Sequence, residues 1–172
     1  MTTENPAAPD GDPDRVARTV EQWRRTAPSL DVSPLEVFGR MHRTYVHYNA
    51  RISRHFGEHD LSPAGFEVIA ALYRHGEPYR MSVTQLAGET LISAGGMTMR
   101  LDRLERDGYV VRDRTSPDRR LVLVSLTPVG LERVVEVATE HFANEAAMLT
   151  CLDEDERRVL AGLLATLERH LR

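Results

Sequence analysis

The residues best suited to chemistry in this sequence are arginines, and the chemistry they favour is the binding of anions. Between Ser93 and Arg120 there are seven arginines and five acidic residues, whereas the whole chain of 172 residues carries a net charge of −4. The seven are Arg100, Arg103, Arg106, Arg112, Arg114, Arg119 and Arg120. A small basic region on an acidic chain is compatible with one DNA-binding face and argues against a protein that coats nucleic acid non-specifically.

The elements around these arginines are predicted to be two helices joined by a tight turn. A capping box at Ser82–Gln85 begins a short helix that ends near Thr90. Leu91 and Ile92 form the turn, and Ser93 begins a longer helix to about Asp107. In that helix Met97, Leu101 and Leu104 recur at helical spacing and are expected to face the core.

A two-stranded hairpin is predicted to follow the second helix. Gly108 suits a left-handed helix end, and the runs Tyr109–Arg112 and Leu121–Val124 have strand composition. Thr115–Asp118 between them has turn composition. Helix, turn, helix and basic hairpin in this order are typical of a winged helix-turn-helix, which places one helix in the DNA major groove.

Helices are predicted on both sides of this module. The expected fold is mostly α with a small β-hairpin wing, and apolar stripes at both ends of the chain indicate helices that pair in a homodimer. The alternative is that these helices pack on their own core. The predicted parts are a disordered tail at 1–13, N-terminal helices at 14–60, the winged helix-turn-helix at 61–126 and C-terminal dimerisation helices at 127–172.

The second helix of the module is expected to contact DNA through Ser93, Gly95, Gly96, Thr98 and Arg103. Small residues at its start allow the backbone to approach phosphates and base edges, and the amides of a helix start favour anions. For Arg103 an equal alternative is an ion pair with carboxylates of its own helix.

From about Ser33 onward the chain resembles the MarR family of bacterial transcription regulators, which are homodimers with a central winged helix-turn-helix. The most specific match is SPDRRLVLVSLTPVG, Ser116 to Gly130, where Asp118-Arg119-Arg120 corresponds to the D-x-R wing signature. The resemblance implies that Arg120 enters the minor groove and that Asp118 holds it by a charge-assisted hydrogen bond. Arginine suits a narrow, strongly negative groove because its guanidinium is weakly hydrated.

A narrower resemblance links Val20–Arg40 and Ile92–Glu105 to the urate-responsive MarR subfamily, which has an additional first helix carrying a tryptophan. It implies that Trp23 packs on a planar ligand, that Arg100 pairs with the anionic edge of that ligand, and that the ligand releases DNA. Two acidic positions of that site correspond to Glu67 and Gln85 here. Because Gln85 carries no charge, another purine or an aromatic acid is as plausible an effector as urate.

Other functions have weaker support in the sequence. We find no G-x-S-x-G, no phosphate-binding loop and no H-x-E with paired cysteines, so neither catalysis nor a cofactor is expected. His55 and His59, and His42 and His47, leave metal sensing open as an alternative, although Gly57 is expected to interrupt the first pair. Acidic neighbours disfavour a reactive thiolate at Cys151, the single cysteine, and an architectural DNA-binding dimer without effector is the last alternative. No long apolar segment is present, so a cytoplasmic protein without a membrane span is expected.

Overall fold

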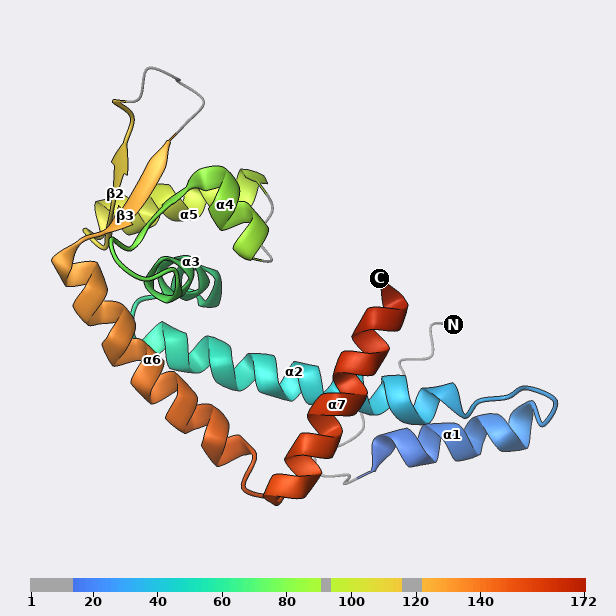
Figure 1. The fold of residues 1–172 in the computed structure, drawn as a ribbon. Coiled ribbons are helices and arrows are strands. Elements are labelled where there is room, and N and C mark those ends of the chain that lie inside the picture. Colours follow the sequence, from blue (N-terminus) through green and yellow to red (C-terminus); the bar gives the residue numbers. More distant parts are fainter. Residues whose placement is uncertain (1–13, 91–93, 116–121) are drawn as a thin grey trace, which may run out of the picture. The chain divides into compact units, whose positions relative to one another are not determined.

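The computed structural model describes residues 14–90, 94–115 and 122–172, and in this part of the chain it is mostly helical with one small sheet (Figure 1). The elements are α1 (Arg15–Thr26), α2 (Pro34–Glu58), α3 (Pro63–Arg74), β1 (Arg80–Ser82), α4 (Val83–Glu89), α5 (Ala94–Arg106), β2 (Val110–Asp113), β3 (Leu123–Leu126), α6 (Pro128–Met148) and α7 (Glu154–Leu171). The predicted fold class is confirmed. Two compact units divide between Arg51 and Ile52, within α2.

In the N-terminal unit, α1 pairs with the first half of α2 through two ion pairs and a small apolar contact. Asp14 caps α1 by accepting a 2.8 Å hydrogen bond from the amide of Ala17, and its carboxylate also lies 2.9 Å from the Arg40 guanidinium. Val16 and Val20 are the buried residues of α1. The first helix predicted from the tryptophan-containing segment therefore exists and is attached to α2 within its own unit.

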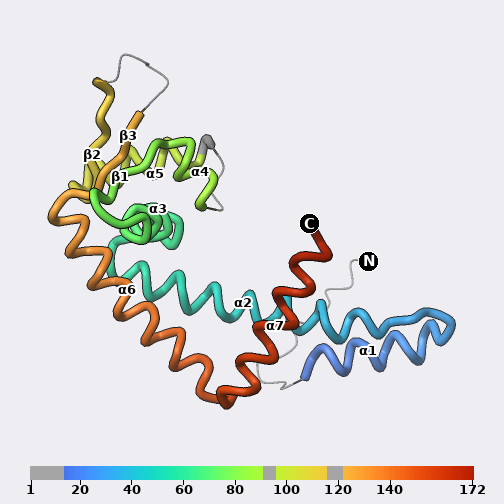
Figure 2. The backbone as a smooth tube through the Cα atoms, viewed as in Figure 1, coloured from blue at the N-terminus to red at the C-terminus, as the bar shows by residue number. Residues whose placement is uncertain are grey.

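The sheet has three strands rather than the two that the sequence predicts. β3 is central and pairs antiparallel with β2 on one side and with β1 on the other; Figure 2 traces this order. β1 is only three residues long, and Arg80, Met81 and Ser82 pair with Ser125, Val124 and Leu123. So short a segment has no alternation of its own, and its strand conformation comes from pairing with a distant part of the chain.

The core of the C-terminal unit is assembled around α3. Seven of its twelve residues are buried, so it is covered on most sides rather than along one stripe. Met97, Leu101 and Leu104 of α5 are buried as predicted, and Val124 of β3 joins them. The buried side of α5 fixes which of its residues remain available to a partner.

The connection from the wing to α6 explains the Thr-Pro-x-Gly sequence. Thr127 is the N-cap of α6, accepting a 2.9 Å hydrogen bond from the amide of Gly130 and donating one of 2.6 Å to the carbonyl of Gly108. A β-carbon at Gly130 would lie 1.9 Å from the carbonyl oxygen of Tyr109, which excludes any side chain there. Gly108 has φ +79°, the left-handed helix end that the sequence predicts.

Within the described residues, no helix combines the length and the apolar composition that a membrane crossing requires.

Candidate nucleic-acid interface

The helix-turn-helix is positioned by a complete capping box at the start of α4. The Ser82 hydroxyl accepts a hydrogen bond from the amide of Gln85 at 3.2 Å, and the Gln85 side-chain oxygen accepts one from the amide of Ser82 at 2.8 Å. Gln85, a sequence-predicted ligand residue, therefore uses its side-chain carbonyl to hold α4. Its side chain is nevertheless exposed at the surface of the unit.

The first two turns of α5 carry the sequence-predicted DNA contacts. Thr98 is exposed, on the side of the helix away from buried Met97, and Gly96 is half-buried. Gly95 belongs to α5, whereas Ser93 lies outside the described residues. Next to Thr98, the exposed side chain of Met99 adds an apolar surface that the sequence analysis did not single out. Such a surface suits contact with a thymine methyl group or with a ligand.

Arg103 is occupied within the chain. Its Nε lies 3.5 Å from the Asp107 carboxylate on the same helix, and its guanidinium donates to the carbonyl of Asp60 at 3.2 Å. The own-helix ion pair that the sequence left open is therefore present. A DNA contact by Arg103 would require it to exchange these partners for a phosphate.

The wing is locked to α5 by Arg112. Its guanidinium lies 2.5 Å from Asp102 and 2.5 Å from Glu105, and its amide donates to the same Glu105 carboxylate at 3.0 Å. The Arg112 side chain is only 11% exposed, so it belongs to the scaffold of the basic region. In the sequence alone, Arg112 counts among the seven arginines of the basic region and cannot be told apart from those that could contact DNA. Asp118, Arg119 and Arg120, the predicted wing contacts, lie outside the described residues.

Arg112→Met is expected to lower the free energy of unfolding by about 1–3 kcal/mol at pH 7, because it leaves two carboxylates without their donor. The Arg112 hydrogen bonds, opposed in part by burial, hold the pKa of Glu105 below its ordinary value of 4.5. A carboxyl with a lowered pKa adds stability above its unfolded pKa and loses it as the pH falls through its folded pKa. The difference between wild type and variant should therefore shrink below about pH 4.5.

Urea unfolding at pH 7 and at pH 3 measures this effect, and Arg114→Met is the matched control. The Arg114 guanidinium lies 4.0 Å from the same Glu105 carboxylate but is 63% exposed. Its loss should change stability by less than about 0.5 kcal/mol, as for other exposed ion pairs. The proposed role of Arg112 would be contradicted if both substitutions changed the free energy of unfolding equally. It would also be contradicted if the effect of Arg112→Met were the same at pH 3 as at pH 7.

Arg100 has an incompletely satisfied guanidinium. It donates to the carbonyl of Gly96 at 2.9 Å, while its buried Nε has no hydrogen-bond partner among the described residues. The side chain lines a cavity of about 290 Å³ between α5 and the start of α3. The other residues of this cavity are Leu61, Ser62, Gly65, Met99, Arg103, Leu104, Arg106 and Asp107. Asp107 offsets the charge of Arg103, so Arg100 and Arg106 leave the cavity with a positive charge that suits an anion.

The remaining predicted ligand residues are divided between the two units. Glu67 is half-buried on α3, in the same unit as Arg100. Trp23 belongs to α1 in the other unit, where it is 47% exposed and borders a hollow of about 360 Å³ with Leu30, Val32 and Leu35. A tryptophan left this exposed offers an apolar surface for a ligand or a partner.

Comparison with known proteins identifies the family. Residues 59–121 match the MarR family model, a range that includes α3, the helix-turn-helix formed by α4 and α5, and strand β2. The chain is 36% identical over 156 residues to the HTH-type transcriptional regulator PecS of Dickeya dadantii (strain 3937), covering 91% of this chain and 94% of that protein. The chain belongs to the MarR family. As a MarR-family protein it is a DNA-binding transcription regulator, and its relatives are regulators rather than enzymes.

Solved structures of MarR-type proteins have the same fold. A putative MarR-like transcription regulator from Bacillus cereus ATCC 10987 superposes with a TM-score of 0.72 at 25% identity, covering 83% of this chain and all of that one. Bordetella bronchiseptica BpsR superposes with a TM-score of 0.69 at 25% identity, over 77% of this chain and 98% of its own. The BpsR structure concerns regulation of its DNA binding by 6-hydroxynicotinic acid.

Proposed function

We propose that this MarR-family regulator is a homodimeric repressor that binds a pseudo-palindromic operator and leaves it when a small anionic aromatic or purine-like molecule binds. The main support for an effector is Arg100, whose buried Nε has no hydrogen-bond partner among the described residues. Arg100 lies on α5, the helix expected to contact DNA. A ligand that pairs with Arg100 acts on the same helix that holds the operator. Sensing and DNA release are thereby joined in one element.

On the DNA side, α5 lies in the major groove, where Ser93, Gly95, Gly96 and Thr98 approach phosphates and base edges. The exposed position of Thr98, beside the buried face of α5, supports this orientation. The wing places Arg120 in the minor groove, with Asp118 orienting it and Arg119 close to the backbone. The Arg112 lock fixes the base of the wing against α5, so both reading elements keep a constant spacing.

Dimerisation follows from apolar surface that the single chain leaves uncovered. None of the eighteen residues of α7 is buried, although the helix carries a row of large apolar side chains. The exposed ones are Val159, Leu160, Leu163, Leu164 and Leu171, and α6 adds Val135 and Phe142. A second copy of the chain is the partner that covers such stripes in a regulator whose operator has two half-sites.

The effector is an anion with a flat ring. Arg100 would supply the charge, and Glu67 and Gln85, in the same unit, would supply polar contacts. Trp23, in the N-terminal unit, offers the aromatic surface that the family resemblance implies. A ligand that takes the Gln85 side chain would also loosen the capping box of α4, the first helix of the DNA-binding motif. The 6-hydroxynicotinic acid that regulates BpsR is itself a flat heteroaromatic acid, which supports this class of molecule. A hundredfold loss of DNA affinity needs only about 2.7 kcal/mol of coupling.

A titration with urate, xanthine, salicylate and 6-hydroxynicotinate tests the effector. Trp23 is the only tryptophan, so intrinsic fluorescence reports its surroundings directly. At least one compound should change this fluorescence and release labelled operator DNA at the same concentration. If none of the four compounds changes the fluorescence or the DNA binding, the proposed effector class is wrong. An architectural DNA-binding dimer without effector is then favoured.

A further inference from the structure

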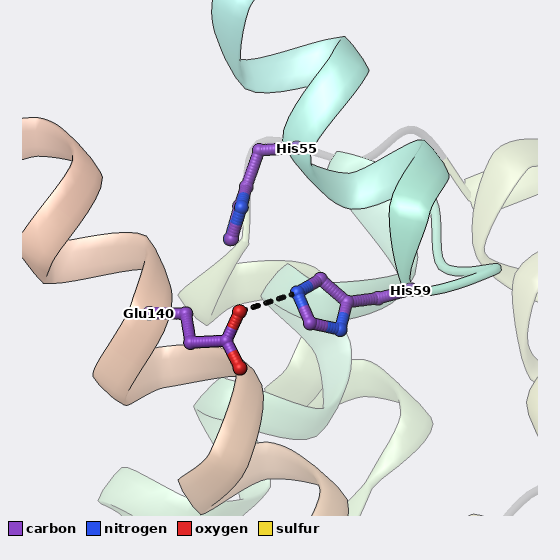
Figure 3. A group of neighbouring side chains, drawn as sticks. All are labelled: His55, His59 and Glu140. Carbon is purple, nitrogen blue, oxygen red and sulfur yellow. Dashed lines mark ion pairs between the residues drawn. The ribbon is translucent and has the colours of Figure 1, made fainter.

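Two histidines and a glutamate converge beside the core of the C-terminal unit, away from the residues assigned to DNA or effector. His55 lies in the last turn of α2, His59 directly follows the end of that helix, and Glu140 projects from α6 (Figure 3). One nitrogen of each histidine and one oxygen of Glu140 all lie within 4.8 Å of one another. The sequence placed a break at Gly57, but α2 continues through Gly57 to Glu58 and carries both histidines to the same place.

The cluster holds a donor atom that the protein leaves unpaired. His59 Nε2 lies 3.2 Å from the Glu140 carboxylate, so an ordinary ion pair accounts for those two side chains. That pair does not involve His55 Nε2, which is buried and has no hydrogen-bond partner among the described residues. A buried polar atom without a partner destabilises the folded protein. A metal ion bonded to His55 Nε2 would remove this destabilisation.

We propose that His55, His59 and Glu140 bind a divalent transition-metal ion, with Zn²⁺ as the best fit. Two imidazoles and one carboxylate form a zinc ligand set, and three protein ligands leave a fourth position for water or another ligand. Zinc holds nitrogen and oxygen donors at about 2.0–2.2 Å, which places neighbouring donors ~3.4 Å apart in a tetrahedron. The donor atoms now lie within 4.8 Å of one another, so metal binding requires small rotations of these side chains, and Glu140 is 57% exposed.

The surroundings hold the two histidines in place. The Arg133 guanidinium donates to the carbonyl of His59, and the His59 amide donates to the carbonyl of Phe56 at 3.1 Å. Arg133 also pairs with Glu136 at 2.9 Å, which offsets its positive charge near the site. The ring of His55 stacks on His141 with centroids 6.0 Å apart. Fixed ligands of this kind reduce the reorganisation that metal binding requires.

Metal binding would join the end of α2 to α6 in the unit that carries the helix-turn-helix. α6 packs on α3, the centre of that core, so the ion would stabilise the scaffold of the DNA-binding elements. This inference does not depend on the effector proposed at Arg100. The site includes the pair His55 and His59, which the sequence leaves open as a metal-sensing alternative.

The full-length protein, stripped with a chelator and dialysed, should bind one Zn²⁺ per chain in competition with a chromophoric chelator. Co²⁺ should give the visible absorption bands of a tetrahedral complex, and saturating Zn²⁺ should raise the melting temperature. Glu140→Gln and His59→Gln should each weaken Zn²⁺ binding at least tenfold and abolish the Co²⁺ bands. Both positions are at the surface or near it, so circular dichroism should show folded variants.

His47→Gln and Glu132→Gln are the matched controls, since they remove an exposed histidine from α2 and an exposed glutamate from α6. Both should bind Zn²⁺ as the wild type does. A wild-type Kd for Zn²⁺ above about 10 µM, far weaker than the roughly 50 nM of the weakest structural zinc sites, would overturn the proposal. So would wild-type affinity in both Glu140→Gln and His59→Gln.

Discussion

Arg120→Ala is expected to weaken binding to the specific operator by about 10- to 100-fold at physiological salt. A well-placed arginine contact in a DNA groove contributes about 1–3 kcal/mol, and this one is expected to enter a narrow minor groove where the potential is most negative. The base of the wing is rigid because Arg112 ties β2 to α5. The loss should therefore come from the missing guanidinium rather than from a displaced wing. Fluorescence anisotropy with labelled duplex measures it.

Two further variants test whether the shape of the Arg120 side chain matters beyond its charge, and whether the effect is specific to this position. Arg120→Lys keeps the charge but replaces a flat, weakly hydrated group by a compact, strongly hydrated one, so its affinity should fall between wild type and Arg120→Ala. Arg172→Ala removes one arginine at the C-terminal end of α7, where it pairs with Glu168, and should leave binding unchanged. If Arg120→Ala binds DNA as tightly as Arg172→Ala does, the assignment of the wing to the DNA interface is wrong.

Arg100→Gln is expected to weaken the response to the effector while keeping most of the DNA affinity. A charge-assisted hydrogen bond to an anion contributes about 1.5–3 kcal/mol, so the effector concentration that releases DNA should rise by about 10- to 150-fold. The measurement is the same titration of urate, xanthine, salicylate and 6-hydroxynicotinate, followed by Trp23 fluorescence and DNA release. Arg114→Gln, at an exposed position directly after β2, is the control and should respond as the wild type does.

The competing role for Arg100 is a direct phosphate contact. In that case Arg100→Gln would weaken DNA binding in the absence of any effector, and the salt dependence of binding would become shallower by about one ion per arginine lost. The unchanged effector midpoint in the same variant would confirm that the side chain belongs to the DNA face. The two roles thus give opposite results in one experiment.

The sequence predicts the features of the fold that depend on residues close together in the chain. The capping box at Ser82, the left-handed end at Gly108 and the buried side of α5 depend on residues within a few positions of one another. β1 could not be predicted in this way. Its three residues become a strand because they pair with β3, more than a helix away in the chain.

The candidate sites show the same division between local and distant contacts. Counting arginines indicated a basic region, but it could not show that Arg112 is enclosed by Asp102 and Glu105 or that Arg103 is bound to Asp107. The spacing of His55 and His59 was visible in the sequence, whereas Glu140 approaches them only through the packing of α6. Charge and spacing therefore predict a candidate region, and the fold determines which of its side chains remain available to a partner.

The central claim is that two copies of this chain bind one pseudo-palindromic duplex. Repeated selection from a pool of random duplexes with the purified protein, followed by sedimentation of the complex, tests it most directly. The expected result is an enriched sequence with two inverted half-sites about one helical turn apart, near 10 base pairs, and two chains per duplex. A pool that stays random, or a complex with a single chain on an asymmetric site, would contradict it.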